Sequence, residues 1–96
     1  MGKDDKKKEG DLEIKFNTAA ADIKSSGITL DNDTLLTLYG YYKQAVEGDC
    51  TGDAPGFFDF KGKSKYDAWV QHKGMDKESA MKRYTKKVEK ILDKKY

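Results

Sequence analysis

Apolar residues recur along most of the chain at steps of three and four, which places them on one face of an α-helix. Serine–glycine clusters and short acidic residues interrupt this pattern where helices would end or begin. The sequence predicts four helices, which start near Leu12, at residues 31–33, near Gly62 and at Asp76. The first three are expected to end at residues 25–27, at Gly48 and at Lys73, respectively. Their expected buried stripes are Leu12, Phe16, Ala19, Ala20 and Ile23; Leu35, Leu38, Tyr42, Ala45 and Val46; Tyr66, Trp69 and Val70; and Met81, Tyr84, Val88, Ile91 and Leu92.

The connection between the second and third helices is the one long loop of the pattern. Residues 48–59 contain three glycines and Pro55, and Phe57, Phe58 and Phe60 follow at its end. Such a composition is typical of a loop rather than of a helix. Aromatic residues in a loop usually plug the end of a core, and we expect the same here; the alternative is that they grip a partner.

Composition agrees with an all-α domain. The 96 residues suffice for one domain with a thin core, and 36% apolar against 38% charged residues fits amphipathic helices with solvated outer faces. A single proline and few β-branched residues argue against an all-β chain. The net charge of +2 is low for a general nucleic-acid binder, although a local lysine cluster can still form an anion site.

The first eleven residues differ from the rest of the chain. They hold four lysines and four acids and almost no apolar side chain. The sequence therefore predicts a charged flexible tail at residues 1–11 and the domain proper at residues 12–96. The tail can be read as a disordered leader or as a weak electrostatic tether.

Cysteine usage and apolar run length indicate a cytoplasmic protein. Cys50 is the only cysteine, so no intrachain disulfide forms and a reducing compartment is expected. The chain has neither an apolar run of transmembrane length nor an apolar core for secretion near its start. Gly2 does not indicate myristoylation, because Lys6 occupies the position where serine or threonine is required.

Catalysis is the weakest functional class for this chain. It has one histidine, His72, and one cysteine, without a cluster at metal-ligand spacing. Neither a zinc site nor a nucleophile–base pair can be assembled, and no phosphate-binding glycine loop is present. We therefore expect no enzyme activity, no catalytic residue, no metal and no cofactor.

The second predicted helix carries a candidate binding face. Tyr39, Tyr42 and Lys43 stand at i, i+3 and i+4 and share one side, with Leu35 one turn earlier. A structural interpretation puts Tyr42 in the core and leaves Lys43 in solvent. A functional interpretation makes this side a platform for a flat ring and an anion.

Further residues favour the functional interpretation. Gly40 stands in mid-helix, where it costs about 0.5–1 kcal/mol relative to alanine. Lys61, Lys63 and Lys65 cluster at the start of the third helix, where cations oppose the dipole unless an anion neutralises them. Tyr84 adds a phenol to an otherwise aliphatic stripe, and its hydroxyl needs a partner.

A longer motif then becomes visible. The segments YYKQA, GD, PG and DFKGKSKYDAW, in this order, resemble the acyl-CoA-binding protein family, and the similarity extends from about Phe16 to Leu92. This resemblance implies a four-helix bundle with up-down-down-up topology. It also implies an intracellular carrier and pool former that transports long-chain fatty acyl-CoA in fatty acid metabolism, with the CoA head held by tyrosine and lysine and the acyl chain in an interhelical groove.

The resemblance nominates ligand-contacting positions. Tyr39, Tyr42 and Lys43 match the adenine- and phosphate-contacting helix face, which also includes Gly40 and Tyr41. Lys65 matches the lysine that pairs with the 3′-phosphate, and Lys61 lies in the same basic turn. The remaining matched positions are Lys24 and Tyr84 for the head group, and Ala20, Asn32, Leu35 and Leu36 for the pocket lining.

Three residues depart from the family pattern. Ser26 replaces a bulky apolar residue, and Leu30 stands where proline is common. Both change the expected shape of the first interhelical connection and of the acyl-chain end of the groove. Tyr66 replaces a tryptophan but keeps an aromatic ring, and the charged tail is an addition to the minimal domain.

Other functional classes remain as alternatives. A small helical nucleic-acid-binding module could use the same lysines and tyrosines, and an interaction module could use the three phenylalanines. An acyl-CoA thioesterase would lack residues for hydrolysis. We expect a monomer that binds no nucleic acid and makes at most transient contact with membranes.

Overall fold

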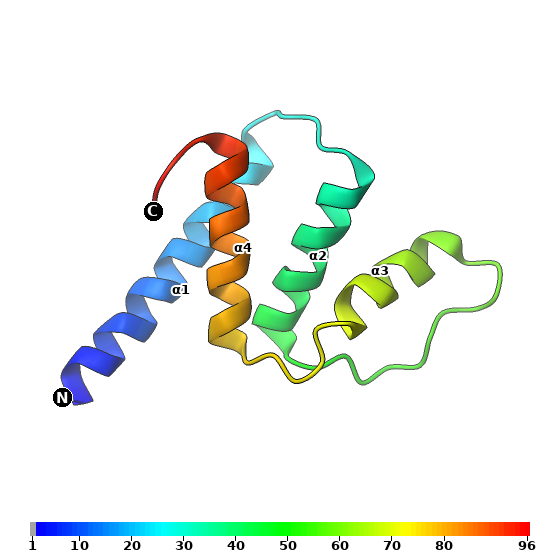
Figure 1. Ribbon diagram of the computed structural model, residues 1–96, viewed down its shortest axis with the longest axis horizontal. Coiled ribbons are helices and arrows are strands. Elements are labelled where there is room, and N and C mark those ends of the chain that lie inside the picture. Colours follow the sequence, from blue (N-terminus) through cyan, green and yellow to red (C-terminus); the bar gives the residue numbers. More distant parts are fainter. Residues whose placement is uncertain (1) are drawn as a thin grey trace.

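The structure is a computed structural model, which describes the backbone of residues 2–96 and the side chains of residues 10–96. The described chain forms four helices and no strand: α1 (Gly2–Ser25), α2 (Asn32–Glu47), α3 (Phe60–Val70) and α4 (Lys77–Leu92). Figure 1 shows α1 and α4 running upward and α2 and α3 running downward, which is an up-down-down-up order. The predicted all-α four-helix fold is confirmed.

Side-chain caps fix most of the helix boundaries. The Asp31 carboxylate accepts the Thr34 N–H at 2.7 Å, and Asp76 accepts the Ser79 N–H at 3.2 Å. Gly48 ends α2 with a φ of 83°, a backbone conformation that favours glycine. The third helix begins and ends earlier than predicted, at Phe60 and Val70, and Asp59 provides its N-cap.

Helix α1 also begins earlier than the apolar pattern, at Gly2 instead of Leu12. Whether residues 1–11 behave as a separate flexible tail, distinct from a domain at residues 12–96, stays a prediction. In the part of the chain that the structure describes, no helix is long and apolar enough to cross a membrane.

The core lies where α4 packs against both α1 and α2. The Phe16 and Tyr84 rings meet edge to face there, with centroids 5.1 Å apart. Within the described residues, the buried apolar side chains are Phe16, Ala19, Leu38, Ala45, Ala68, Ala80, Tyr84 and Val88. The predicted stripes of α1 and α4 supply half of these residues, namely Phe16, Ala19, Tyr84 and Val88.

The predicted stripe of α2 is partly wrong. Leu35, Tyr42 and Val46 are 50%, 40% and 46% exposed. Helix α2 packs against α4 and also against α3, so two of its sides are covered. Its buried positions therefore include Gly40 and Gln44, and the side that carries Leu35, Tyr42 and Val46 remains open.

Glycine at position 40 permits the contact between α2 and α3. A Cβ built on Gly40 would lie 2.2 Å from the Ala68 carbonyl oxygen, far closer than any real Cβ contact. A flexible side chain could rotate out of the way, but the backbone of α3 can relieve this clash only if the helix moves away. The mid-helix glycine therefore has a packing reason.

A buried glutamine joins the two connections that flank α3. Gln44 is fully buried, and its Nε2 donates to the Met75 carbonyl oxygen at 2.7 Å and to Asp49 Oδ1 at 2.9 Å. The same Asp49 oxygen accepts the Gly74 N–H at 2.8 Å. These bonds tie the α3–α4 connection to the C-terminal end of α2.

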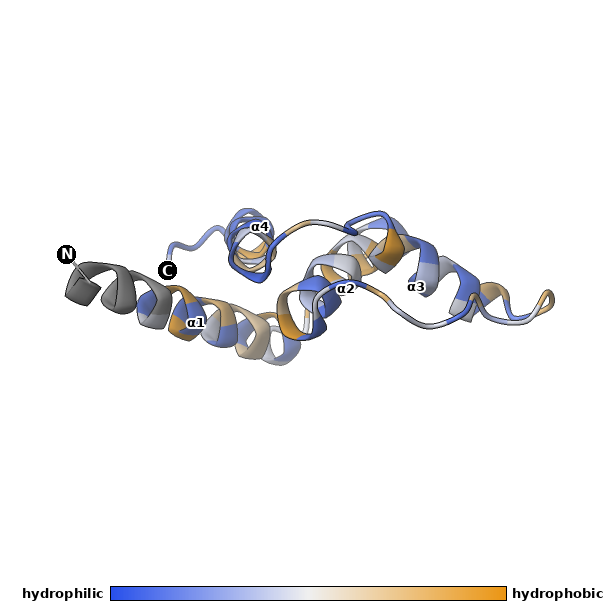
Figure 2. Cartoon of the chain, turned by 90° about the horizontal axis from the view of Figure 1, so that it is seen from below, coloured by the Kyte–Doolittle hydropathy of each residue, from blue (hydrophilic) through white to orange (hydrophobic). Residues whose placement is uncertain are grey.

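The three loop phenylalanines do not plug the core. Phe57, Phe58 and Phe60 are 88%, 83% and 74% exposed, so the predicted plug is wrong. Figure 1 shows the α2–α3 connection swinging away from the α1–α4 pair before α3 returns, and Figure 2 shows it at one end of the molecule. The three phenylalanine side chains therefore lie outside the core.

The Gly40–Ala68 contact generates a stability prediction. We expect Gly40→Ala to lower the free energy of unfolding by about 1–3 kcal/mol, because overpacking outweighs the gain in helix propensity. The matched control is Gly10→Ala in α1, where the new Cβ meets no atom within 4 Å and should stabilise the helix slightly. Chemical denaturation of both variants tests this, and equal stabilisation by the two substitutions would contradict it.

Candidate ligand-binding site

An apolar groove of about 690 Å³ opens between α1, α2 and the connection that joins them, with Tyr84 of α4 at its base. The residues that line it are Ala20, Ala21, Ile23, Lys24, Ile28, Leu30, Leu35, Leu38, Tyr39, Tyr42 and Tyr84. The open side of α2 thus forms one wall of the groove. Its walls are mainly aliphatic and aromatic, which suits an acyl chain or another apolar ligand.

Stacked aromatic rings form the floor of the groove. The Tyr42 ring stacks on Phe16 with centroids 5.5 Å apart, and it lies 5.8 Å from Tyr84. Burial, followed by the neighbouring Tyr42, raises the pKa of Tyr84 to about 12. Tyr84 therefore remains a neutral phenol at physiological pH, which can donate a hydrogen bond to a ligand oxygen.

Lysines from two helices lie in or beside the groove. Lys24 of α1 is one of the residues that line it, as is Tyr39 of α2. The Nζ of Lys65, on α3, lies 5.6 Å from the centroid of the Tyr39 ring, within the range of a cation–π contact. Helix α3 therefore brings positive charge to one tyrosine of the groove, and Lys24 adds a second cation to the lining.

Lys43 stands one turn after Tyr39 and is held by its own neighbours. Its Nζ pairs with the Glu47 carboxylate and lies 4.9 Å from the Trp69 ring centroid. The hydrogen bond from Lys43 to Glu47 raises the pKa of the lysine above its usual value. Lys43 is thus a fixed charge at the junction of α2 and α3.

The start of α3 adds exposed lysines. Lys61 and Lys63 lie in its first turns, and Lys63 forms an ion pair with Asp67 at 2.7 Å. The Asp59 carboxylate accepts the Gly62 N–H at 2.9 Å, so a side chain of the protein already occupies this helix end. The basic turn therefore acts through its ammonium groups rather than through free backbone N–H groups.

The structure brings together part of the predicted site. The predicted residues that line the groove are Ala20, Lys24, Leu35, Tyr39, Tyr42 and Tyr84. Lys65 joins them through Tyr39, and Lys43 lies beside the same ring on α2. The contact roles of these residues stay predictions.

The other predicted residues do not line the groove. Gly40 faces the backbone of α3, and Tyr41 stacks on His72 with ring centroids 4.5 Å apart. Asn32, Leu36 and Lys61 are not part of the groove lining either.

Sequence reasoning missed the apolar lining from the first connection. Ile28 and Leu30 face the groove, and Leu30 also packs against the core. Ser26 shapes this segment, since its Oγ donates to the Ile23 carbonyl oxygen at 2.9 Å and accepts the Ile28 N–H at 3.2 Å. Ser26 and Leu30, the two departures from the family pattern in this connection, thus belong to a turn that places apolar side chains at the groove.

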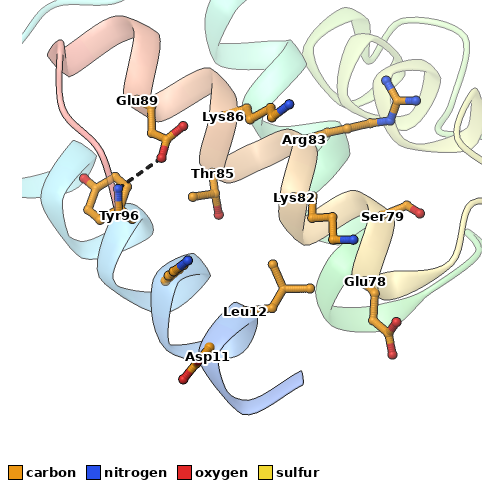
Figure 3. A pocket seen from close by; sticks show the side chains of 11 residues that line it. Asp11, Leu12, Glu78, Ser79, Lys82, Arg83, Thr85, Lys86, Glu89 and Tyr96 are labelled. Carbon is orange, nitrogen blue, oxygen red and sulfur yellow. Dashed lines mark hydrogen bonds between the residues drawn. The ribbon is translucent and has the colours of Figure 1, made fainter. Parts of the chain in front are cut away.

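A second, larger cleft of about 840 Å³ lies between the start of α1 and α4 (Figure 3). Three acidic side chains, Asp11, Glu78 and Glu89, stand among four basic ones, Lys15, Lys82, Arg83 and Lys86. The acidic side chains would repel a polyanion that binds there. We therefore take the smaller groove, which has three tyrosines, Lys24 and no acidic side chain in its lining, as the candidate site.

Comparisons with known proteins agree in pointing to one family. The family model described as "Acyl CoA binding protein" matches residues 13–88. The chain is 43% identical over 83 residues to "Acyl-CoA-binding protein homolog 1" of Caenorhabditis elegans, covering 86% of this chain and 96% of that protein.

Solved structures give the same result. The crystal structure of Oryza sativa Acyl-CoA-Binding Protein 2 superimposes with a TM-score of 0.81 at 40% identity, covering 85% of this chain and 91% of that chain. The crystal structure of ACBP from Moniliophthora perniciosa gives a TM-score of 0.77 at 37% identity, with 84% and 80% covered. These identities are high enough for the likeness to extend beyond the fold.

The stacked His72 ring generates a pH prediction. Burial and, to a smaller extent, Arg83 lower the pKa of His72 below 6.5. The unfolded state therefore binds this proton first, and the free energy of unfolding should fall as the pH drops below about 6.5. The carboxyl groups of Asp22 and Asp49 also have lowered pKa values, but their contribution is lost mainly below about pH 5, so the test is made between about pH 5 and 7. Denaturation midpoints measured against pH for the parent and His72→Gln should differ in slope there, and parallel curves would show that His72 is not responsible.

Proposed function

This chain belongs to the acyl-CoA-binding protein family, and from that premise we propose that it binds long-chain fatty acyl-CoA esters as an intracellular carrier and pool former. The observation that carries the proposal is the Lys65 ammonium over the Tyr39 ring of an apolar groove. A ring, a cation and an aliphatic cleft in this order correspond to the adenine, phosphate and acyl parts of the ligand.

The head group is proposed to bind at Tyr39. Adenine stacked on an aromatic ring contributes about 1–3 kcal/mol by analogy with nucleic-acid bases. Adenine would replace the Lys65 ammonium over the ring, and Lys65 would then turn to the 3′-phosphate. Lys24 and Lys43 supply further charge from α1 and α2. Each charge-assisted hydrogen bond to phosphate contributes about 1.5–3 kcal/mol.

The acyl chain is proposed to lie in the groove. The lining from Ile23, Ile28 and Leu35 can remove methylenes from water, at about 0.8 kcal/mol each. Tyr84 can donate its phenolic proton toward the pantetheine arm or a phosphate. The protein would then shield the acyl chain from water and neutralise the phosphates with lysine side chains. It would release the ester unchanged.

The non-enzymatic role follows from the same site. The groove lining contains no cysteine, histidine or carboxylate that could attack or activate water at a thioester. In the described residues, no group of three or more potential ligands could hold a metal ion. Binding and transfer, rather than hydrolysis, are therefore the proposed activity, and we assign the carrier to the cytoplasm as a monomer.

Calorimetric titration of palmitoyl-CoA, free CoA and palmitate tests the two-part ligand. We expect palmitoyl-CoA to bind most tightly, since it alone both fills the groove and reaches the lysines. Shortening the chain should weaken binding progressively, because fewer methylenes leave water. Palmitate that binds as tightly as palmitoyl-CoA would contradict the assignment of the head-group site.

Single substitutions test the residues. Lys65→Ala should weaken binding of palmitoyl-CoA by about 10–100-fold, and Tyr39→Leu by about tenfold, as estimated from charge-assisted bonds and stacking. Lys95→Ala removes an exposed lysine of the C-terminal segment and is the control for net charge. If Lys65→Ala and Lys95→Ala bind alike, with unchanged helicity in both, the site is wrongly placed.

A further inference from the structure

Three exposed phenylalanines mark a second functional surface. Phe57, Phe58 and Phe60 form what we call the aromatic tip, at the end of the α2–α3 connection and the first residue of α3. The rings of Phe57 and Phe58 touch edge to face, with centroids 5.2 Å apart. A single exposed apolar residue is ordinary, but adjacent large rings that are almost wholly exposed indicate a contact with something else.

An exposed lysine adjoins the aromatic tip. Lys61 follows Phe60 directly, whereas the ammonium group of Lys65 lies over the Tyr39 ring. Asp67 pairs with Lys63, and the Asp59 carboxylate, which keeps its negative charge, accepts the Gly62 N–H. The tip thus combines apolar rings with the exposed ammonium group of Lys61, a pairing that suits the interface of an anionic lipid bilayer.

The shape of the region favours a bilayer over a folded protein partner. The connection projects at one end of the long dimension of the molecule, and its apolar residues lie near that end (Figure 2). A bilayer accepts a projecting, convex tip without a complementary pocket, since only a shallow insertion of rings is required. A protein partner would need a cavity matched to the rings.

We propose that this protein docks on anionic membrane surfaces by inserting the aromatic tip, with Lys61 against the lipid phosphates. This inference rests on the proposed function: docking would bring α3, whose Lys65 reaches Tyr39 of the groove, to the membrane from which acyl-CoA is taken. The tip touches the membrane, and the groove holds the ligand. The two surfaces share α3 and can be tested separately.

Co-sedimentation with vesicles, in the absence of acyl-CoA, tests the docking. The full chain is mixed with vesicles of phosphatidylcholine alone or of equimolar phosphatidylcholine and phosphatidylserine. We expect binding to the anionic vesicles, and binding at least about tenfold weaker for the double variant Phe57→Ser/Phe58→Ser. The matched control is Ile14→Ser, which removes an apolar side chain that is 65% exposed on α1 and should leave binding unchanged.

A second measurement separates docking from ligand binding. Calorimetry with octanoyl-CoA in vesicle-free buffer should give the same affinity for the parent and the double variant, because the aromatic tip is not part of the groove. Loss of vesicle binding with retained octanoyl-CoA binding supports the proposal. If no CoA ester binds, but vesicle binding still depends on Phe57 and Phe58, the proposed function fails and the docking proposal stands.

Three outcomes would overturn the docking proposal. The parent protein does not sediment with anionic vesicles, or the double variant sediments as well as the parent does. Alternatively, sedimentation velocity shows a dimer that the double substitution abolishes while vesicles bind nothing, which would assign the tip to a second copy of the chain.

Discussion

The close approach of two backbones at Gly40 and Ala68 is the constraint on which the rest of the structure depends. In the described chain, α3 packs against α2 and against no other helix, so this contact sets where α3 lies. The lysine that reaches Tyr39 comes from α3. A methyl group at position 40 would push α3 outward and carry Lys65 away from the ring.

Hydrogen bonds at the C-terminal end of α2 reinforce this contact. The buried amide of Gln44 bridges Asp49 and the Met75 carbonyl, and the Trp69 indole N–H donates to the Gly48 carbonyl oxygen at 2.9 Å. Buried hydrogen bonds of this kind contribute modestly when made but are costly to leave unmade. These bonds satisfy the Gln44 amide nitrogen on the covered side of α2. The side that carries Leu35 and Tyr42 remains open for a ligand.

Much of the fold could be predicted from local chemistry. Asp31, Asp76 and Gly48 cap helices as their residue types suggest, and the predicted α1 and α4 stripes contribute Phe16, Ala19, Tyr84 and Val88 to the core. The exposure of Leu35 could not be predicted, because periodicity identifies an apolar face but does not say how many neighbours a helix has. The phenylalanines were misplaced for a related reason, since turn composition indicates a loop but not its distance from the core.

The candidate site was only partly predictable. The tyrosine face followed from spacing along one helix, and the lysine cluster at residues 61–65 followed from its place at a helix start. Lys24 and the individual contact roles of the lysines were assigned through the family resemblance. Ile28 and Leu30 were missed because two hydrogen bonds of Ser26 determine how the first connection folds.

Mapping amide chemical shifts during titration with palmitoyl-CoA tests the central claim most directly, since it reports both clefts at once. The account predicts that the largest shifts occur at Lys24, Tyr39 and Lys65, which lie on three different helices and line or adjoin the groove. Shifts confined instead to Lys82, Thr85 and Tyr96, which line the cleft between α1 and α4, would contradict it.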